Sequence, residues 1–328
     1  MKKIIIITSL CTILLLVIPL TLGDNGDLKK EPLDEPTPPD QPISGPGGSD
    51  YLHNNVIKNR YNYGEKQYWI FEPDDPKPES APFIVFIHGG GAIHPIIYLE
   101  WINHIVKKGN ILVYPRYQLG LTGKFSNFFE NTIQAVEDAI IELQKNVHII
   151  PLLDKFAIVG HSIGGGMTAY MAAVAEDFNF PVPKVIMSVQ PSVPSGNLVD
   201  LSRITNETLM IVLVGEDDMH VGNKSAKTIF YDTTQIPSSQ KDFIIQRTDR
   251  YGSPDLIANH LAPVCIPIFN IVNAMDYYST WKIFDGLTDY AFYGINKEYC
   301  LGNTPEQKFM GFWSDGTPVK ELSVTDNP

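Results

Sequence analysis

The sequence has no cluster of lysine or arginine. Its 25 basic residues are outnumbered by 37 aspartates and glutamates, which gives a formal net charge of −12 at pH 7. The phosphates of a nucleic acid would be repelled by such a surface, so we expect no nucleic-acid partner. Charged residues make up 19% of the chain and hydrophobic residues 44%, as in ordinary globular proteins. One α/β domain of this length can bury a sizeable core without a second folded domain.

The N-terminus carries a targeting signal. Two lysines are followed by an uncharged apolar run from Ile4 to Leu22. This run approaches the about 20 residues that cross a bilayer, and the small residues Thr21 and Gly23 also suit a signal-peptide cleavage site. Residues 1–23 are therefore either a cleaved signal peptide or a retained anchor. Either way we expect the rest of the chain to be extracytoplasmic, secreted or tethered to the outer face of the membrane by this run alone.

Cysteine is scarce. Of three cysteines, Cys11 falls in the N-terminal run, which leaves Cys265 and Cys300 in the exported part. Export permits a disulfide between these two. One bridge is not needed to hold so large a core, so two separate buried thiols are an equally open alternative.

Large apolar residues are few from residue 24 to residue 50, where proline, glycine, aspartate and glutamate dominate. A stretch of this composition cannot bury enough surface to fold by itself. The sequence therefore predicts a disordered linker over residues 24–50 and one folded domain over residues 51–328.

Short apolar runs that alternate with helical periodicity predict the fold. Continuous runs of this kind are typical of parallel strands buried on both faces. They lie at Phe83–Ile87, Ile111–Tyr114, Phe156–Val159, Val185–Met187, Leu209–Val214 and Phe243–Ile245. Between the second and third runs, apolar residues recur at spacings of three and four, as on one face of a helix packed against a sheet. We expect an α/β fold with a doubly wound, mostly parallel sheet and helices on both faces.

Two further features concern the chain after the third strand. Few residues separate the runs at Val185 and Leu209, so no large cap domain is expected there. A long aromatic-rich helix is predicted between Ile266 and Leu287, after the last strand, and the tail from residue 288 onward has no chemical interpretation.

The segment Gly160-His161-Ser162-Ile163-Gly164 joins a predicted strand to a predicted helix. A serine at such a sharp turn is held in a strained conformation that exposes its hydroxyl above the sheet, and its neighbours must be small. The alternative of a phosphate-binding loop lacks the required Lys-Ser/Thr pair. Ser162 is therefore the candidate nucleophile.

Here the sequence resembles the α/β-hydrolase superfamily in its esterase/lipase-like branch, from about Tyr68 to His260. A second match is the segment His88-Gly89-Gly90-Gly91-Ala92, which follows a strand as the HGGG-type loop of the family does. The resemblance implies that an oxyanion hole is formed by backbone N–H groups of this loop, with Gly89, Gly90 and Gly91 as candidates, together with that of Ile163.

The third match follows the strand that ends at Val214. It resembles the Gly-x-x-Asp-x-x-Val loop of the family and implies that Asp218 is the catalytic acid. Asp217 is the alternative, because a one-residue shift in the loop would exchange the two. A metal site built from Glu216, Asp217, Asp218 and His220 is a further alternative without diagnostic spacing.

The order serine, acid, histidine of the family leaves two histidines beyond Asp218. His220 is too close along the chain to reach the serine independently, so His260 is the expected general base. His161, beside the nucleophile, is expected to be structural.

These features together predict a serine hydrolase that cleaves small or medium carboxylic esters through an acyl-enzyme. The partner is a small-molecule ester or acyl substrate, and no cofactor or metal ion is expected. A serine peptidase or acyltransferase on the same fold is an alternative, and so is a non-catalytic cell-surface binding protein. A decayed enzyme should have lost a triad residue, and Ser162, Asp218 and His260 are all available.

Overall fold

The computed structural model describes residues 35–120, 123–178, 180–193, 199–266 and 272–328. Contacts divide the chain into a unit that ends at Glu35 and a compact unit from Pro36 to Pro328. The predicted targeting segment, residues 1–23, lies outside the described residues. None of the helices in the described part is both long and apolar enough to cross a membrane.

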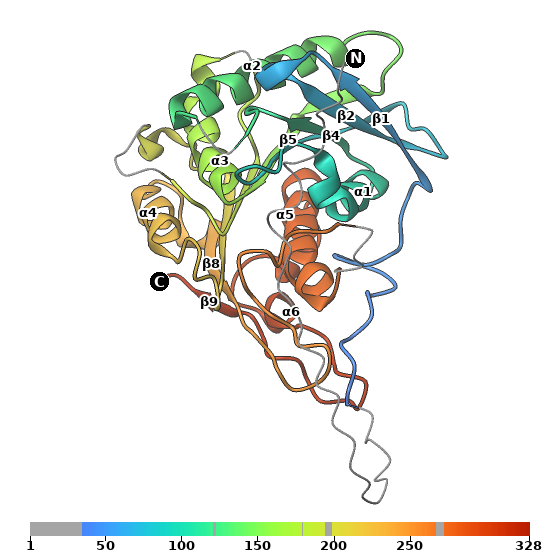
Figure 1. Ribbon diagram of the computed structural model, residues 1–328, viewed down its shortest axis with the longest axis vertical. Helices are drawn as coiled ribbons and strands as arrows, with labels where there is room; N and C mark the ends of the chain where they lie inside the picture. The colour runs from blue at the N-terminus through green and yellow to red at the C-terminus, as the bar shows by residue number, and fades with distance from the viewer. Residues whose placement is uncertain (1–34, 121–122, 179, 194–198, 267–271) are drawn as a thin grey trace, which may run out of the picture. The chain divides into compact units, whose positions relative to one another are not determined.

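A nine-stranded sheet forms the centre of the second unit, with strand order β1-β2-β4-β3-β5-β6-β7-β8-β9 (Figure 1). The six strands from β4 to β8 in this order are parallel, whereas β1, β2 and β9 pair antiparallel at the two edges. The strands are β1 (Asn55–Tyr61), β2 (Tyr68–Asp74), β3 (Ser80–Ile87), β4 (Ile111–Pro115), β5 (Ile150–His161), β6 (Val185–Val189), β7 (Leu209–Gly215), β8 (Lys241–Gln246) and β9 (Ser323–Thr325).

Helices cover both faces of this sheet. The α-helices are α1 (Leu99–Lys107), α2 (Phe125–Leu143), α3 (Ile163–Val174), α4 (Lys224–Asp232), α5 (Lys282–Tyr293) and α6 (Pro305–Lys308), and a π-helix, η7 (Asp276–Trp281), leads into α5. The 3-10 helices are η1 (Gly64–Lys66), η2 (Pro95–Tyr98), η3 (Ala175–Asp177), η4 (Leu201–Arg203), η5 (Ser238–Gln240) and η8 (Lys297–Tyr299).

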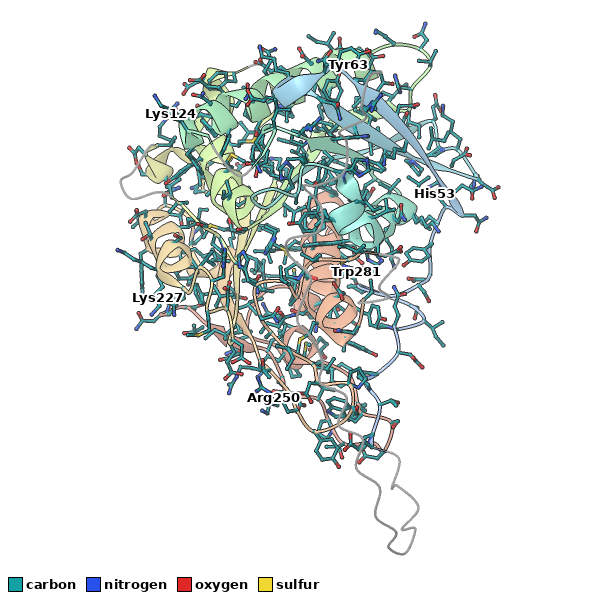
Figure 2. The ribbon with its side chains drawn as sticks, viewed as in Figure 1. His53, Tyr63, Lys124, Lys227, Arg250 and Trp281 are labelled. Atoms are coloured by element: carbon teal, nitrogen blue, oxygen red, sulfur yellow. The ribbon has the colours of Figure 1, made fainter. Side chains whose placement is uncertain are left out.

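Successive side chains along each strand point to opposite faces of the sheet, so a separate core forms on each face. On β3, Phe83 and Val85 face the core that α2, α3 and α4 cover, whereas Ile84 and Phe86 face the core beneath α1 and α5. Side chains such as Trp281 fill the second core (Figure 2). Central strands such as β4, β6 and β7 are buried on both sides and are therefore almost continuously apolar. The prediction of a doubly wound, mostly parallel sheet with helices on both faces is confirmed.

No large cap lies between β6 and β7, as predicted. β6 ends at Val189 and β7 begins at Leu209, and the described residues between them contain one short helix, η4. The aromatic-rich helix starts inside the predicted stretch, with the π-helix from Asp276, and continues past the predicted end at Leu287 to Tyr293. Within the predicted stretch, residues 267–271 lie outside the described residues.

The folded part begins earlier than the sequence indicated. Residues 36–50, placed in the linker by their composition, belong to the compact unit, whose boundary is Pro36 rather than residue 51. The Pro36 carbonyl accepts a hydrogen bond from Ser253 N–H, and Gly47 N–H donates to the buried Asp285 carboxylate at 2.8 Å. The segment is thus held by hydrogen bonds of its backbone, which composition does not reveal.

The C-terminal tail completes the sheet and covers its second core. Its strand β9 pairs with β8, and Trp313 is 1% exposed with its indole N–H donating to Asp249 at 3.1 Å. The Lys282 ammonium donates to the backbone carbonyls of Glu306, Gln307 and Phe309. The tail is therefore an integral part of the domain.

Cys265 and Cys300 are separate, buried free thiols, so the disulfide alternative is wrong. The Cys265 thiol donates to the Asp276 carboxyl, and the Cys300 thiol to the Lys297 carbonyl, each at 3.3 Å. Burial raises the pKa of both thiols. The core forms around these thiols without a cross-link.

Asp276 should make stability depend on pH. Burial raises the pKa of this carboxyl from 3.8 to about 7. Between about pH 4 and pH 7 the folded state keeps a proton on Asp276 that the unfolded state releases. The contribution of Asp276 to the free energy of unfolding is therefore complete at acid pH and is lost as the pH rises to about 7. Asn cannot ionise, so in Asp276→Asn the melting temperature should fall less between pH 5 and pH 8 than in wild type. An equal fall in both proteins would contradict the assignment.

Candidate active site

Ser162 occupies the sharp turn between β5 and α3. Its φ of 58° and ψ of −121° form a conformation that residues other than glycine rarely adopt. The flanking glycines make room for this turn, since a Cβ at Gly160 would lie 2.4 Å from the Gly164 carbonyl and one at Gly164 2.1 Å from the Ile87 carbonyl. The tight turn places the Ser162 side chain at the carboxyl end of the central strand.

Two hydrogen bonds connect Ser162, His260 and Asp218. His260 Nε2 lies 3.0 Å from Ser162 Oγ, and His260 Nδ1 lies 2.8 Å from Asp218 Oδ2. A carboxylate accepts hydrogen bonds only, so Nδ1 carries the proton and donates it to Asp218. Nε2 is then the acceptor for the Ser162 hydroxyl, and this arrangement can remove the hydroxyl proton.

Asp218, rather than its neighbour Asp217, contacts His260. The second oxygen of Asp218 accepts from the backbone N–H groups of His220 and Val221 at 3.0 and 3.1 Å, and the residue is 5% exposed. Asp217 instead accepts from Thr248 and Arg250, each at 2.8 Å, and these bonds lower its pKa. Arg250 lies at the surface (Figure 2).

The side chains of the four residues of the metal-site alternative contact other groups rather than one another. Glu216 pairs with Arg247 at 3.0 Å, Asp217 with Arg250, and Asp218 with His260. Within the described ranges, no three His, Cys, Asp or Glu side chains gather as metal ligands would. The His220 ring instead packs against His260, with ring centroids 4.8 Å apart.

His161 contacts the other side of the candidate base. Its ring centroid lies 4.7 Å from that of His260, while its nitrogens face the Tyr98 hydroxyl and the Gln190 amide rather than Ser162. Burial lowers the pKa of His161 to about 3. His161 is therefore neutral and does not repel a positive charge on His260.

The glycine loop after β3 lies against Ser162. A Cβ at Gly89 would be 3.3 Å from Ser162 Cβ, and one at Gly90 3.1 Å from Ile163 Cδ1. Gly89 N–H already donates to the Tyr98 hydroxyl at 3.1 Å. Within the described residues, the N–H groups of Gly90, Gly91 and Ile163 have no acceptor. Of the predicted donors, Gly89 is thus occupied by a protein partner, and the other three stay available to an oxyanion.

His88 and its neighbours hold this loop in place. The His88 ring contacts the Arg116 carbonyl at 2.7 Å and stacks on Tyr117 at 4.0 Å, and burial lowers its pKa to about 4. The Tyr117 hydroxyl donates to the His88 carbonyl at 2.7 Å. The loop is therefore fixed from both sides before any ligand binds.

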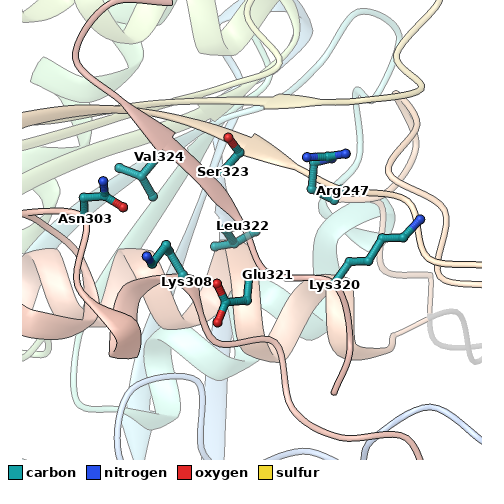
Figure 3. Close-up of a pocket in the computed structure, with 8 residues that line it drawn as sticks. All are labelled: Arg247, Asn303, Lys308, Lys320, Glu321, Leu322, Ser323 and Val324. Atoms are coloured by element: carbon teal, nitrogen blue, oxygen red, sulfur yellow. The ribbon is translucent and has the colours of Figure 1, made fainter. Parts of the chain in front are cut away.

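A hollow of about 500 Å³ lies elsewhere, at the sheet edge formed by β8 and β9 (Figure 3). It is lined by none of Ser162, Asp218 or His260. Its basic side chains do not point to a common centre. Arg247 pairs with Glu216, Lys320 donates to the Thr248 carbonyl, and Lys308 points away from Arg247 and Lys320. The candidate active site is therefore the one at Ser162.

Two residues of the site, Tyr98 and Gln190, were not found from the sequence, and neither was the packing of the His220 ring against His260. Gln190 directly follows β6, and its position at the carboxyl end of a parallel strand is the signal that could have indicated it. Tyr98 lies at the end of η2 and has no such signal.

Residues 84–233 match a family model described as an alpha/beta hydrolase fold. The match begins within β3, includes the sharp turn at Ser162 and ends after α4. No curated protein matches the chain.

Proposed function

Because the chain belongs to the α/β-hydrolase superfamily and is a hydrolase of the esterase/lipase type, we propose that it is an extracytoplasmic serine hydrolase that cleaves carboxylic esters of small or medium size. The observation that supports this proposal is the chain of two hydrogen bonds from Asp218 through His260 to Ser162. It gives the serine hydroxyl a proton acceptor in the required tautomer.

The reaction has two halves. Ser162 Oγ attacks the ester carbonyl carbon while its proton passes to His260 Nε2, and the tetrahedral oxyanion accepts hydrogen bonds from Ile163 N–H and from Gly90 or Gly91. The imidazolium then protonates the leaving alcohol, which leaves an acyl group on Ser162. Water then attacks the acyl carbon while His260 takes one of its protons. The bond from this carbon to Ser162 Oγ breaks, the imidazolium returns the proton to Oγ, and the carboxylic acid is released.

Buried charges favour this course. The Asp218 carboxylate, held by two backbone N–H groups, stabilises the imidazolium that forms on His260. His161 remains neutral beside it, because burial lowers its pKa to about 3. The positive end of α3, which begins at Ile163, faces the developing negative charge.

The export part of the proposal rests on residues 1–23, the two lysines and the apolar run that follows them. Protease added to intact cells that express the full chain should cleave it. Protection from protease until the cells are lysed would contradict export.

Hydrolysis of p-nitrophenyl esters of increasing acyl length, compared with matched p-nitroanilides, tests the reaction. The full-length protein should label with a fluorophosphonate probe and should hydrolyse the esters. Faster cleavage of the anilides would favour a peptidase, and a product that appears only with an added alcohol would favour an acyltransferase. A folded protein that neither labels nor hydrolyses any of these would be the non-catalytic binding protein.

A further inference from the structure

A chain of buried hydrogen bonds runs behind Ser162 from the glycine loop to the residue before His260. Gly89 N–H lies 3.1 Å from the Tyr98 hydroxyl, which lies 2.8 Å from His161 Nδ1. His161 Nε2 lies 3.1 Å from Gln190 Oε1, and Gln190 Nε2 lies 2.7 Å from the Asn259 carbonyl. The chain thus joins the loop that carries the oxyanion donors to the loop that carries the general base.

Only one arrangement of protons satisfies every member of this chain. The Gln190 amide N–H donates to the Asn259 carbonyl, and its Oε1 can only accept, so His161 carries its proton on Nε2 and donates it to Oε1. Nδ1 of the neutral imidazole then accepts from the Tyr98 O–H, and the Tyr98 oxygen accepts from Gly89 N–H. Tyr98, His161 and Gln190 are almost entirely buried, so water cannot replace a lost partner.

Gln190 is fixed unusually firmly at the centre of this chain. It is fully buried, and its backbone has a φ of 44°, a value in the left-handed region that residues other than glycine rarely adopt. Its N–H donates to the Leu213 carbonyl at 2.6 Å, which ties it to the neighbouring strand β7. With its backbone in this conformation, the Gln190 amide lies between His161 and the Asn259 carbonyl.

We propose that Gln190 is a positioning residue for the reaction at Ser162. Its amide holds the Asn259 carbonyl and thereby the adjacent His260, and through His161 and Tyr98 it holds the Gly89 end of the oxyanion loop. Catalysis needs both loops in place within a fraction of an ångström, and a displacement of about 1 Å can cost about a hundredfold in rate. This inference rests on the proposed esterase function.

The test compares Gln190→Met, Tyr98→Phe and the double variant by steady-state ester hydrolysis. Methionine keeps the length of glutamine without its amide, and phenylalanine removes only the hydroxyl. Each single variant should lower kcat about tenfold or more and change KM less than about twofold. The double variant should lose less than the product of the two single losses, because both break the same chain.

Gln246→Met is the matched control. Gln246 is also fully buried, follows the same pattern at the end of a parallel strand, and donates its amide to a backbone carbonyl, that of Met275, at 2.8 Å. Among the described residues, none of its hydrogen bonds joins it to Ser162, Asp218 or His260. Its replacement should lower the melting temperature but leave kcat unchanged, which separates a loss of stability from a loss of positioning.

Several outcomes would overturn the inference. If wild type is active through Ser162 and Gln190→Met retains kcat within about twofold, Gln190 does not position the site, although the esterase function stands. If Gln190→Met does not fold, Tyr98→Phe decides in the same way, because it keeps the ring and its packing. A wild type that neither labels nor hydrolyses esters would instead remove the proposed function itself.

Discussion

Replacing Ser162 by alanine should abolish fluorophosphonate labelling and lower ester turnover by about 10⁴-fold or more, which is the scale on which nucleophile removal acts in serine hydrolases. Only the oxygen that forms the acyl-enzyme bond is lost. The remaining hydrogen-bond donors and His260 can still assist water weakly, so a small residual rate is expected. Labelling followed by gel fluorescence and the initial rate of ester hydrolysis measure the two effects.

The fold should survive this change. Alanine keeps the Cβ of Ser162 in the same turn, and the backbone bonds from Ser162 N–H to Val189 and from Ser192 N–H to the Ser162 carbonyl remain. The control is Ser188→Ala, at a fully buried serine on β6 whose hydroxyl has no partner among the described residues. That variant should label like wild type. Labelling that persists in Ser162→Ala would remove Ser162 as the nucleophile.

Asp218→Asn should be nearly as severe, with a loss in kcat of about 10⁴-fold. Asparagine fills the same space, but its amide can turn an N–H toward His260 Nδ1. The imidazole would then carry its proton on Nε2 and could no longer accept the proton of Ser162, which lies 3.0 Å away. Steady-state kinetics at neutral pH measure the loss, and circular dichroism checks the fold.

Asp217→Asn is the matched control for this prediction. The two aspartates are adjacent in sequence, yet the Asp217 carboxylate binds Thr248 and the exposed Arg250. Removing an exposed ion pair of this kind changes little, so kcat should stay within about twofold of wild type. A severe loss in Asp217→Asn together with a mild one in Asp218→Asn would transfer the role of the acid to Asp217.

The parallel strands and the sharp turn at Ser162 could be predicted because the residues that produce them are close together in the sequence. Burial on both faces makes a strand such as Phe156–Val159 continuously apolar, and a strained turn at Ser162 requires glycine at positions 160 and 164. These patterns are set by sterics and periodicity within a few residues, and they can be read without knowing what lies opposite. The expectation that His260 is the general base has another source, because it is implied by the serine, acid, histidine order of the family that the sequence resembles.

Residues 36–50 and the two cysteines show where such local reasoning fails. Composition indicated that residues 36–50 could not fold by themselves, but Gly47 and Pro36 bond to Asp285 and Ser253, more than 200 positions away. The expected export would permit a disulfide, but whether two thiols meet depends on their distance in the folded chain. Cys265 and Cys300 each bond to a different group instead.

The sequence alone therefore determined the fold class, the absence of a large cap and the positions of Ser162 and the glycine loop. Only the tertiary structure decided that Asp218 rather than Asp217 meets His260, that Gly89 already has an acceptor, and that Gln190 connects the two loops of the site. The physical reason is that neighbouring residues in a loop point in different directions. Which of them reaches a distant partner is fixed by the packing of strands and loops that lie far apart along the chain.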